Sequence, residues 1–510
     1  MTVREKLGSR MEGTARSRLP VSEDESAGAG MAEDDCWDAD TTARVDLHSI
    51  LRRGFCLVFG MKDASIAAPT MPADTPSPLD RARRKAFLRL LPVLFMSYMI
   101  AYVDRQNVAV AKLTMVKDMP AFTDAVIGFG AGIFFLGYFL LEIPGTLMVE
   151  RWSARKWICR IMVSWGIMAA CTAYVSTPTH FYIVRFLLGL AEAGFFPGVI
   201  VYLTHWFTSR DRAKALSYFL IATPFAQMIS PKISNELLKI GADAAHPPIL
   251  GMVGWQWVYV FWGIPAVLLG VAVLWLLTDR PSQAKWLTPE EAEALESELE
   301  RERQAKTRGK RMSVLEAFKH PKVMLLCAAY FFTVMCSYSM EFFMPSVINE
   351  WYQMSMNKLT WLIILPPTLA LCGQLFGGWS SDRFQERRLH ACLPIAMGAI
   401  AMLCAPLTKG NLPLTITCFM IAFAGFKMYM PAFWSLPSLF LAEAAAAGSI
   451  GLINSVGNLG GLAGPTLMGW VKTNTGSFDN GFYVLCCSML ISSSIIFFLG
   501  LGSKQPAKSP

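Results

Sequence analysis

The chain contains twelve apolar segments that are each long enough to cross a lipid bilayer, a length of roughly 20 mostly apolar residues. The first six cover residues 87–111, 125–149, 157–176, 180–205, 213–236 and 257–278, and the second six cover residues 323–346, 359–380, 391–408, 413–436, 446–470 and 481–502. Asp, Glu, Lys and Arg make up 16% of the chain, against about 25% in soluble domains, and they cluster between these segments. The sequence therefore predicts an all-α membrane protein whose twelve transmembrane helices form two six-helix bundles.

Polar stretches divide the chain into five parts. The first stretch, residues 1–80, is rich in Asp, Glu, Ser, Arg, Pro and Ala and cannot bury enough apolar surface to fold. The predicted parts are a disordered cytoplasmic tail (1–80), a first bundle (81–278), a cytoplasmic linker (279–322), a second bundle (323–502) and a cytoplasmic C-terminal tail (503–510). The linker contains both Glu and Lys or Arg in alternation, and part of it, residues 289–306, is predicted to form an exposed charged helix.

Lys and Arg residues are distributed unevenly between alternate loops. They crowd before the first segment, after the second, fourth and eighth segments, and in the linker, which holds ten of them. The other loops hold few, for example Lys239 and Lys358. Because loops rich in Lys and Arg stay in the cytoplasm, we expect both termini and the linker there, in a multi-pass protein of the cell (inner) membrane.

The sequence lacks the motifs of several other protein classes. The 12 Cys residues are scattered, without a CxxC pair or a Cys/His cluster spaced for zinc. The sequence contains no Gly-rich loop followed by Lys and Ser or Thr, the motif that would indicate ATP binding. It also contains no set of nucleophile and base that would indicate an enzyme. The net charge is +8, but the basic residues lie at the ends of apolar segments, a pattern of membrane topology and not of nucleic-acid binding. We expect no metal, no cofactor and no enzymatic activity.

Two loops on the predicted cytoplasmic side, one in each half, have similar charge patterns. The loop after the second segment contains Glu150, Arg151 and Arg155, and the loop after the eighth contains Asp382 and Arg383. Basic residues alone are enough to orient a membrane protein, whereas the repeated acids favour a role in gating between the two halves. Anchoring of the topology is the alternative.

Four stretches of sequence resemble motifs of the anion:cation symporter family, within the major facilitator superfamily. They are YVDRQN (102–107), RFLLGLAEAGFFPG (185–198), FWSLP (433–437) and INSVGNLGG (453–461). The resemblance covers roughly residues 82–500. It implies the major facilitator fold and transport of organic anions such as tartrate, galactarate, hexuronates or phthalate, usually together with protons. Gln256, Glu443, Glu341 and Lys427 depart from the family pattern, and these departures leave the substrate open within this class.

Two pairs of charged residues lie inside predicted membrane helices: Asp104 and Arg105 in the first, and Arg185 and Glu192 in the fourth. Ionised side chains inside a membrane are costly and mark functional sites by default. Arg185 and Glu192 share a helix face but lie too far apart to pair, so their partners are expected on another helix; the family fold places the first helix beside the fourth. We predict that the two arginines bind a carboxylate and that the two acids carry protons. The alternative is salt bridges that only join helices.

The resemblance implies further substrate contacts. Positions similar to substrate contacts of the family are occupied by Tyr138, Gln227, Trp434 and Asn454. Each offers a neutral hydrogen-bonding group suited to the hydroxyls of a sugar acid, although helix packing is the alternative for the two aromatic residues. Lys427 lies seven residues before Trp434. It either binds a second anionic group or pairs with Glu341 or Glu443.

These features predict a secondary active transporter that imports a small organic carboxylate by proton symport through alternating access. We expect a monomer in the lipid bilayer, whose partners are the anion and protons and not nucleic acid. One alternative is a proton antiporter that exports drugs or organic anions; such exporters carry a Gly- and Pro-rich signature on the fifth helix, which residues 217–230 lack. The other is a transporter-like anion sensor, for whose output domain the tail and the linker are too short and polar.

Overall fold

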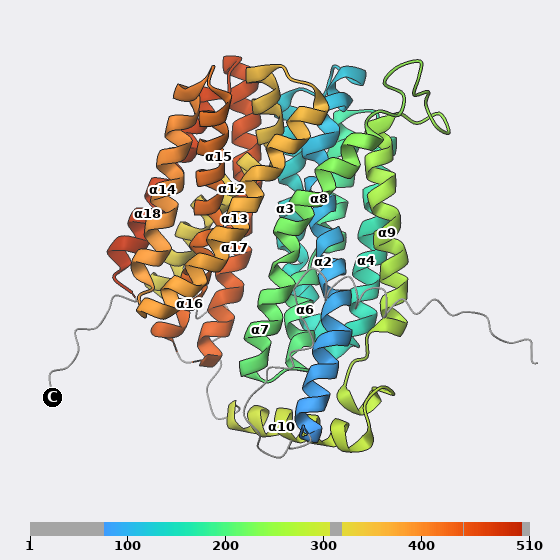
Figure 1. The fold of residues 1–510 in the computed structure, drawn as a ribbon, viewed down its shortest axis with the longest axis vertical. Coiled ribbons are helices and arrows are strands. Elements are labelled where there is room, and N and C mark those ends of the chain that lie inside the picture. The colour runs from blue at the N-terminus through green and yellow to red at the C-terminus, as the bar shows by residue number, and fades with distance from the viewer. Residues whose placement is uncertain (1–75, 307–318, 442, 502–510) are drawn as a thin grey trace, which may run out of the picture. The chain divides into compact units, whose positions relative to one another are not determined.

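The structure is a computed structural model of the chain and describes residues 76–306, 319–441 and 443–501. Nearly all of these residues lie in helices, as Figure 1 shows, which confirms the predicted all-α class. Residues 1–75, the middle of the predicted linker and the predicted C-terminal tail lie outside the described residues.

The first bundle is built from eight helices and one short 3₁₀ turn. Their bounds are α2 (Pro78–Asp118), α3 (Asp124–Arg151), α4 (Ala154–Cys171), η1 (Thr172–Tyr174), α5 (Pro178–Glu192), α6 (Phe195–Thr204), α7 (Ser209–Leu220), α8 (Ala222–Leu237) and α9 (Gly254–Leu276). Local sequence sets several of the starts. Ser77, Thr123 and Ser153 accept hydrogen bonds from free backbone N–H groups at the starts of α2, α3 and α4.

The described part of the second bundle has seven helices and two 3₁₀ turns. Their bounds are α12 (Pro321–Tyr352), α13 (Met356–Phe384), α14 (Arg388–Cys404), η3 (Ala405–Thr408), α15 (Leu412–Met428), α16 (Met430–Ser435), η4 (Pro437–Leu439), α17 (Glu443–Thr475) and α18 (Asp479–Leu499). Ten helices or helix pairs in the described part of the chain are long and apolar enough to cross a membrane. Each of the twelve predicted segments coincides with a helix or with two consecutive helices, and the two segments outside those ten coincide with α7–α8 and α17.

Three of the predicted segments are not continuous helices, which corrects the simplest reading of their hydropathy. The fourth is interrupted between α5 and α6, where Gly194 has a φ of 84°, a conformation that glycine adopts without steric cost. The fifth is interrupted at Ile221 and the tenth at Tyr429, one residue before α16, whose second residue is Pro431. Such interruptions free backbone polar groups inside a membrane and are tolerated where the helices line a site or pack against protein.

The two bundles meet along α3 and α17, with further contacts between α8 and α13 and between α2 and α12 (Figure 1). Small residues allow the main contact. A Cβ atom on Gly469 of α17 would lie 2.2 Å from the backbone oxygen of Asp124, and one on Gly128 of α3 would lie 2.3 Å from the oxygen of Pro465. Close backbone approach of this kind is typical of helix packing in membranes.

The charged helix predicted for the linker is present as α10 (Pro289–Lys306), together with η2 (Pro281–Gln283). One face of α10 is buried rather than exposed, because Glu291 contacts the start of α2. Its carboxylate accepts hydrogen bonds from Lys85 at 2.6 Å and from Arg81 at 3.3 Å. Burial alone raises the pKa of Glu291, but the bonds from Lys85, the Thr288 N–H and Arg81 outweigh it and lower the pKa. The linker helix is thereby fastened to the first bundle.

Candidate functional site

The middle of α2 carries a run of buried polar residues whose side chains point to two different sides of the helix. The run is Tyr102, Asp104, Arg105, Gln106 and Asn107. Because residues three or four apart share a helix face, Tyr102 and Gln106 lie on one side, and Asp104 and Asn107 lie on another. Tyr102 and Gln106 contact α12 of the second bundle, and Asp104 accepts a hydrogen bond from Asn107 within α2.

Arg105 forms an ion pair with Glu192, the last residue of α5, next to the break at Gly194. Arg105 Nε and Nη2 lie 2.7 and 2.6 Å from Glu192 Oε1. The side chains are 9% and 1% exposed. The guanidinium also lies 5.1 Å from the centre of the Tyr138 ring, a cation–π distance. The predicted partner from another helix is therefore Arg105, and the structure brings it together with Glu192 and Tyr138.

Arg185 occupies a different place from Arg105. It is fully buried, and its Nε donates to the backbone oxygen of Gly130 at 3.3 Å. Its Nη1 and Nη2 atoms have no hydrogen-bond acceptor among the described residues. The Oδ2 atom of Asp104 likewise has no hydrogen-bond donor among them. The Phe134 ring lies beside both arginines, 5.6 Å from the Arg105 guanidinium and 5.3 Å from that of Arg185. Of the four predicted charges, Arg105 and Glu192 thus form an ion pair. Asp104 and Arg185 do not form an ion pair with each other in the described part of the chain.

A second buried ion pair lies in the other bundle. Lys427 Nζ of α15 is 3.2 Å from Glu341 Oε1 of α12. The other oxygen of Glu341 accepts hydrogen bonds from Tyr102 at 2.7 Å and from Gln106 at 2.9 Å. Gln227, a predicted substrate contact, donates to the Tyr102 hydroxyl at 3.3 Å. Of the partners considered for Lys427, the structure shows Glu341; the Glu443 side chain lies outside the described ones.

Sequence reasoning missed Glu142 of α3. It is buried and accepts hydrogen bonds from Asn454 at 2.6 Å and from Ser455 at 2.9 Å, both on α17. The predicted substrate contact Asn454 thus joins the two bundles in this structure. The signal that marks Glu142 in the sequence is the one applied to Asp104, an acid inside an apolar segment.

Trp434 is not a member of either buried ion pair. It is half-buried on α16, in an aromatic cluster where its ring centre is 5.0 Å from Tyr330 and 5.4 Å from Phe433. Its ring therefore packs within the second bundle in this structure, and its contact with substrate stays a prediction.

The two predicted gating loops are each closed by ion pairs within their own bundle. Arg155 at the start of α4 lies 3.7 Å from Asp279, whose carboxylate also accepts a bond from Ser153 at 2.6 Å. Asp382 at the end of α13 lies 2.6 Å from Arg387. Arg383 is exposed, and the side chain of Arg151 lies outside the described ones.

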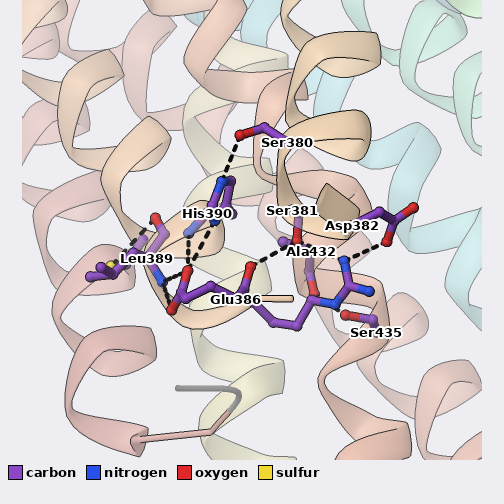
Figure 2. A network of polar contacts seen from close by, with 10 residues as sticks. Ser380, Ser381, Asp382, Glu386, Leu389, His390, Ala432 and Ser435 are labelled. Atoms are coloured by element: carbon purple, nitrogen blue, oxygen red, sulfur yellow. Dashed lines mark hydrogen bonds and ion pairs between the residues drawn. The ribbon is translucent and has the colours of Figure 1, made fainter. Parts of the chain in front are cut away.

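Figure 2 shows the polar network around the Asp382 loop. Glu386 caps the start of α14 by accepting hydrogen bonds from the backbone N–H of Leu389 at 2.8 and 2.9 Å. His390 lies between Glu386 and Ser380, with ring nitrogens 2.9 Å from each. Arg387 also donates to Ser381 at 2.8 Å. These contacts fix the turn between α13 and α14. Within the described ranges, no group of three or more His, Cys, Asp or Glu residues is arranged to hold a metal.

Comparison with known proteins agrees with this architecture. A model of the Major Facilitator Superfamily matches residues 94–465. A protein of Agrobacterium vitis that is provisionally named a tartrate transporter is 38% identical over 422 residues, covering 82% of this chain and 94% of that protein. A quinolone resistance transporter of Acinetobacter baumannii is 36% identical over 416 residues, covering 82% and 94%. The crystal structure of a D-xylose–proton symporter has a TM-score of 0.64 at 14% identity, covering 80% of this chain and 97% of that one.

Proposed function

Because this chain belongs to the major facilitator superfamily and is a multi-pass membrane transporter, we propose that it imports a small organic carboxylate together with protons. Substrate crosses by alternating access, in which the two bundles open in turn to either side. The proposed location is the inner membrane, with both termini and α10 in the cytoplasm. The Agrobacterium vitis relative supports the substrate class through the name that it bears.

The buried pair of Arg105 and Glu192 carries this proposal. A guanidinium forms paired hydrogen bonds with a carboxylate, so an incoming substrate carboxylate competes with Glu192 for Arg105. Once the substrate has displaced it from Arg105, Glu192 remains buried as a negative charge without a partner. Such a buried unpaired charge costs about 3–5 kcal/mol. Binding a proton removes that cost. Anion binding and proton binding are thereby linked through one ion pair.

The contacts between the bundles suggest which state the structure represents. At the end away from α10, Thr473 of α17 accepts a bond from the Ala125 N–H of α3 at 3.0 Å, and Asn235 of α8 donates to Asn357 of α13 at 2.7 Å. If α10 is cytoplasmic, as the Lys and Arg distribution predicts, this closed end is the outer one. The structure then corresponds to a state that is closed to the outside.

Counterflow in proteoliposomes tests the proposal. Vesicles containing the purified protein are loaded with an unlabelled organic anion, and entry of the labelled anion is followed for tartrate, hexuronates and phthalate. We expect saturable counterflow of at least one of these anions and its accumulation when the outside is more acidic. Absence of both for every anion would overturn the proposal.

Export of drugs by proton antiport is the second candidate, and the observation that favours it is the identity to the quinolone resistance transporter. An antiporter accumulates its substrate in vesicles that are acidic inside, the opposite gradient from a symporter. Labelled norfloxacin in the same vesicles therefore separates the two functions. Uptake of norfloxacin driven by internal acid, without counterflow of any anion, would establish the second candidate instead.

A further inference from the structure

The geometry of the second buried ion pair points to a binding site in the C-terminal bundle. We propose that Lys427 binds a second carboxylate of the substrate in exchange for Glu341, and that the released Glu341 takes up a second proton. The preferred substrates are then dicarboxylates. This inference rests on the proposed anion symport and adds to it the charge of the substrate and a further proton site.

Glu341 is held in a way that permits exchange. Its side chain is 1% exposed, and that of Lys427 is 14% exposed. Lys427 Nζ lies 3.2 Å from Oε1, yet Oε1 has no hydrogen-bond partner among the described residues. The contact is therefore a charge pair without hydrogen-bond geometry, unlike the pair of Arg105 and Glu192. An incoming carboxylate that does hydrogen-bond to Lys427 gains the stronger, charge-assisted interaction.

The other oxygen of Glu341 joins the two bundles. It accepts from Tyr102 and Gln106 of α2, while Glu341 itself belongs to α12. A neutral Glu341 accepts these bonds more weakly than a carboxylate does. Protonation of Glu341 therefore loosens a contact that holds α2 against α12 in this state, which is the contact that has to change as the bundles move.

Space for a polar ligand group adjoins this pair. A cavity of about 40 Å³ is lined by Gln106, Gln227, Ser230, Glu341 and Phe423, among others. Gln227 Oε1 is buried without a hydrogen-bond partner in the described part of the chain. A cavity of this size holds water. Phe423 precedes Lys427 by one helical turn on α15, so Lys427 lies on the side of α15 that borders the cavity.

The two exchange sites lie close together on α2. Arg105 contacts Glu192, and its neighbour Gln106 contacts Glu341; the Cα atoms of consecutive residues are about 3.8 Å apart. Each site contains one cation and one acid and is neutral before substrate binds. When a carboxylate replaces each acid and each acid binds a proton from water, both sites are neutral again. One proton is therefore taken up for each carboxylate bound.

Proton counting with a matched pair of ligands tests this inference on the unaltered protein. Tartrate has two carboxylates, and threonate is the same four-carbon chain with a hydroxymethyl group in place of one of them. Binding of each to the purified protein is measured by calorimetry in buffers of different ionisation enthalpy, which yields the protons taken up per ligand. We expect close to one more proton with tartrate than with threonate.

Variants locate the second proton. In Glu341→Gln, tartrate and threonate should take up equal numbers of protons. In Lys427→Gln, tartrate affinity should fall at least about tenfold, as expected for loss of one charge-assisted contact, while threonate affinity stays near that of the wild type. Glu350→Gln is the matched control, because Glu350 lies on the same helix and pairs with Lys472 at 2.7 Å. It should leave both proton counts unchanged.

Several results would overturn the inference. They are equal proton counts for the two ligands in the wild type, an unchanged tartrate count in Glu341→Gln, or equal losses of both affinities in Lys427→Gln. Counterflow of a monocarboxylate without any tartrate binding would overturn it too while leaving the proposed symport intact. If the single variants do not fold, the double variant Glu341→Gln/Lys427→Gln removes both buried charges together and should show the threonate count for both ligands.

Discussion

Arg105 and Arg185 have the same charge and lie beside the same phenyl ring, yet their surroundings suit different roles. Arg105 is paired with Glu192, which a substrate carboxylate can replace. Arg185 is held by a backbone oxygen, and both of its Nη atoms lack acceptors among the described residues. Buried polar atoms of this kind are usually satisfied by ordered water. We therefore assign exchange of the carboxylate to Arg105, whereas binding of a carboxylate by Arg185 stays a prediction.

The substitution Glu192→Gln should separate anion binding from proton binding. In the wild type, ionised Glu192 competes with the substrate for Arg105, so anion affinity should fall as the pH rises. With the monocarboxylate threonate, which does not displace Glu341, the glutamine is neutral at every pH and should make the affinity independent of pH between roughly 6 and 8. Threonate uptake driven by a pH gradient should be lost, while threonate counterflow continues. Binding at several pH values and both kinds of uptake measure this, with the exposed Glu236→Gln as the control.

If Glu192→Gln still accumulates threonate against its gradient as the wild type does, Glu192 is not the proton site that is coupled to Arg105. Asp104, the other acid that the sequence predicts to carry a proton, would then be the candidate. Its Oδ2 atom is buried without a hydrogen-bond partner in the described part of the chain.

At the scale of helices, α3 and α17 form the surface along which the bundles close. The contact is made by backbone against backbone at Gly128 and Gly469, whereas Glu142, Asn454 and Ser455 join the same helices nearer the centre. Small residues let the backbones of such helix pairs approach closely, and van der Waals packing favours their association. The hydrogen bonds of Glu142 fix how α3 and α17 lie against each other, and the glycines allow the two backbones to come that close.

The substitution Gly469→Ala should therefore disfavour closure of this end. The added methyl group meets the Asp124 backbone oxygen at 2.2 Å, so α3 and α17 have to move apart there. We expect faster hydrogen exchange in residues 124–132 and slower transport, both measured against the wild type. Gly451→Ala on the same helix is the control, because a Cβ at Gly451 meets nothing within 4 Å. Equal effects of the two substitutions would show that this contact has no part in closure.

For the whole molecule, the sequence was sufficient to predict the class of fold and the location of the helices. Hydropathy and charge alone decide which segments lie in a membrane, and each predicted segment coincides with a helix or a helix pair. The breaks at Gly194, Ile221 and Tyr429 were not predicted, because an apolar run has the same hydropathy whether or not its helix is continuous.

The site could be predicted only in part, for a different physical reason. Charges inside apolar segments identify candidate residues one at a time. Which of them meet depends on how helices distant in sequence are rotated against each other. Thus the family resemblance indicated that the first helix lies beside the fourth, but not that Arg105 pairs with Glu192. The choice between Glu341 and Glu443 for Lys427 stayed open as well. The bond from Asn454 to Glu142 across the bundles was not foreseen at all.

The charge balance of the molecule leads to a prediction about energetics. Moving one elementary charge across 100 mV is worth about 2.3 kcal/mol. If Glu192 and Glu341 each bind a proton, import of a dicarboxylate is electrically neutral, and a tenfold proton gradient can hold up to a roughly hundredfold substrate gradient. Imposing 100 mV, negative inside, should leave that gradient unchanged. With a single proton the imported species carries one negative charge, and the same potential should lower the gradient about fiftyfold.

Tartrate accumulation in proteoliposomes at a fixed pH gradient, with the potential clamped at zero and at 100 mV, distinguishes the two stoichiometries. A strong dependence on the potential in the wild type would show that only one of the two acids carries a proton.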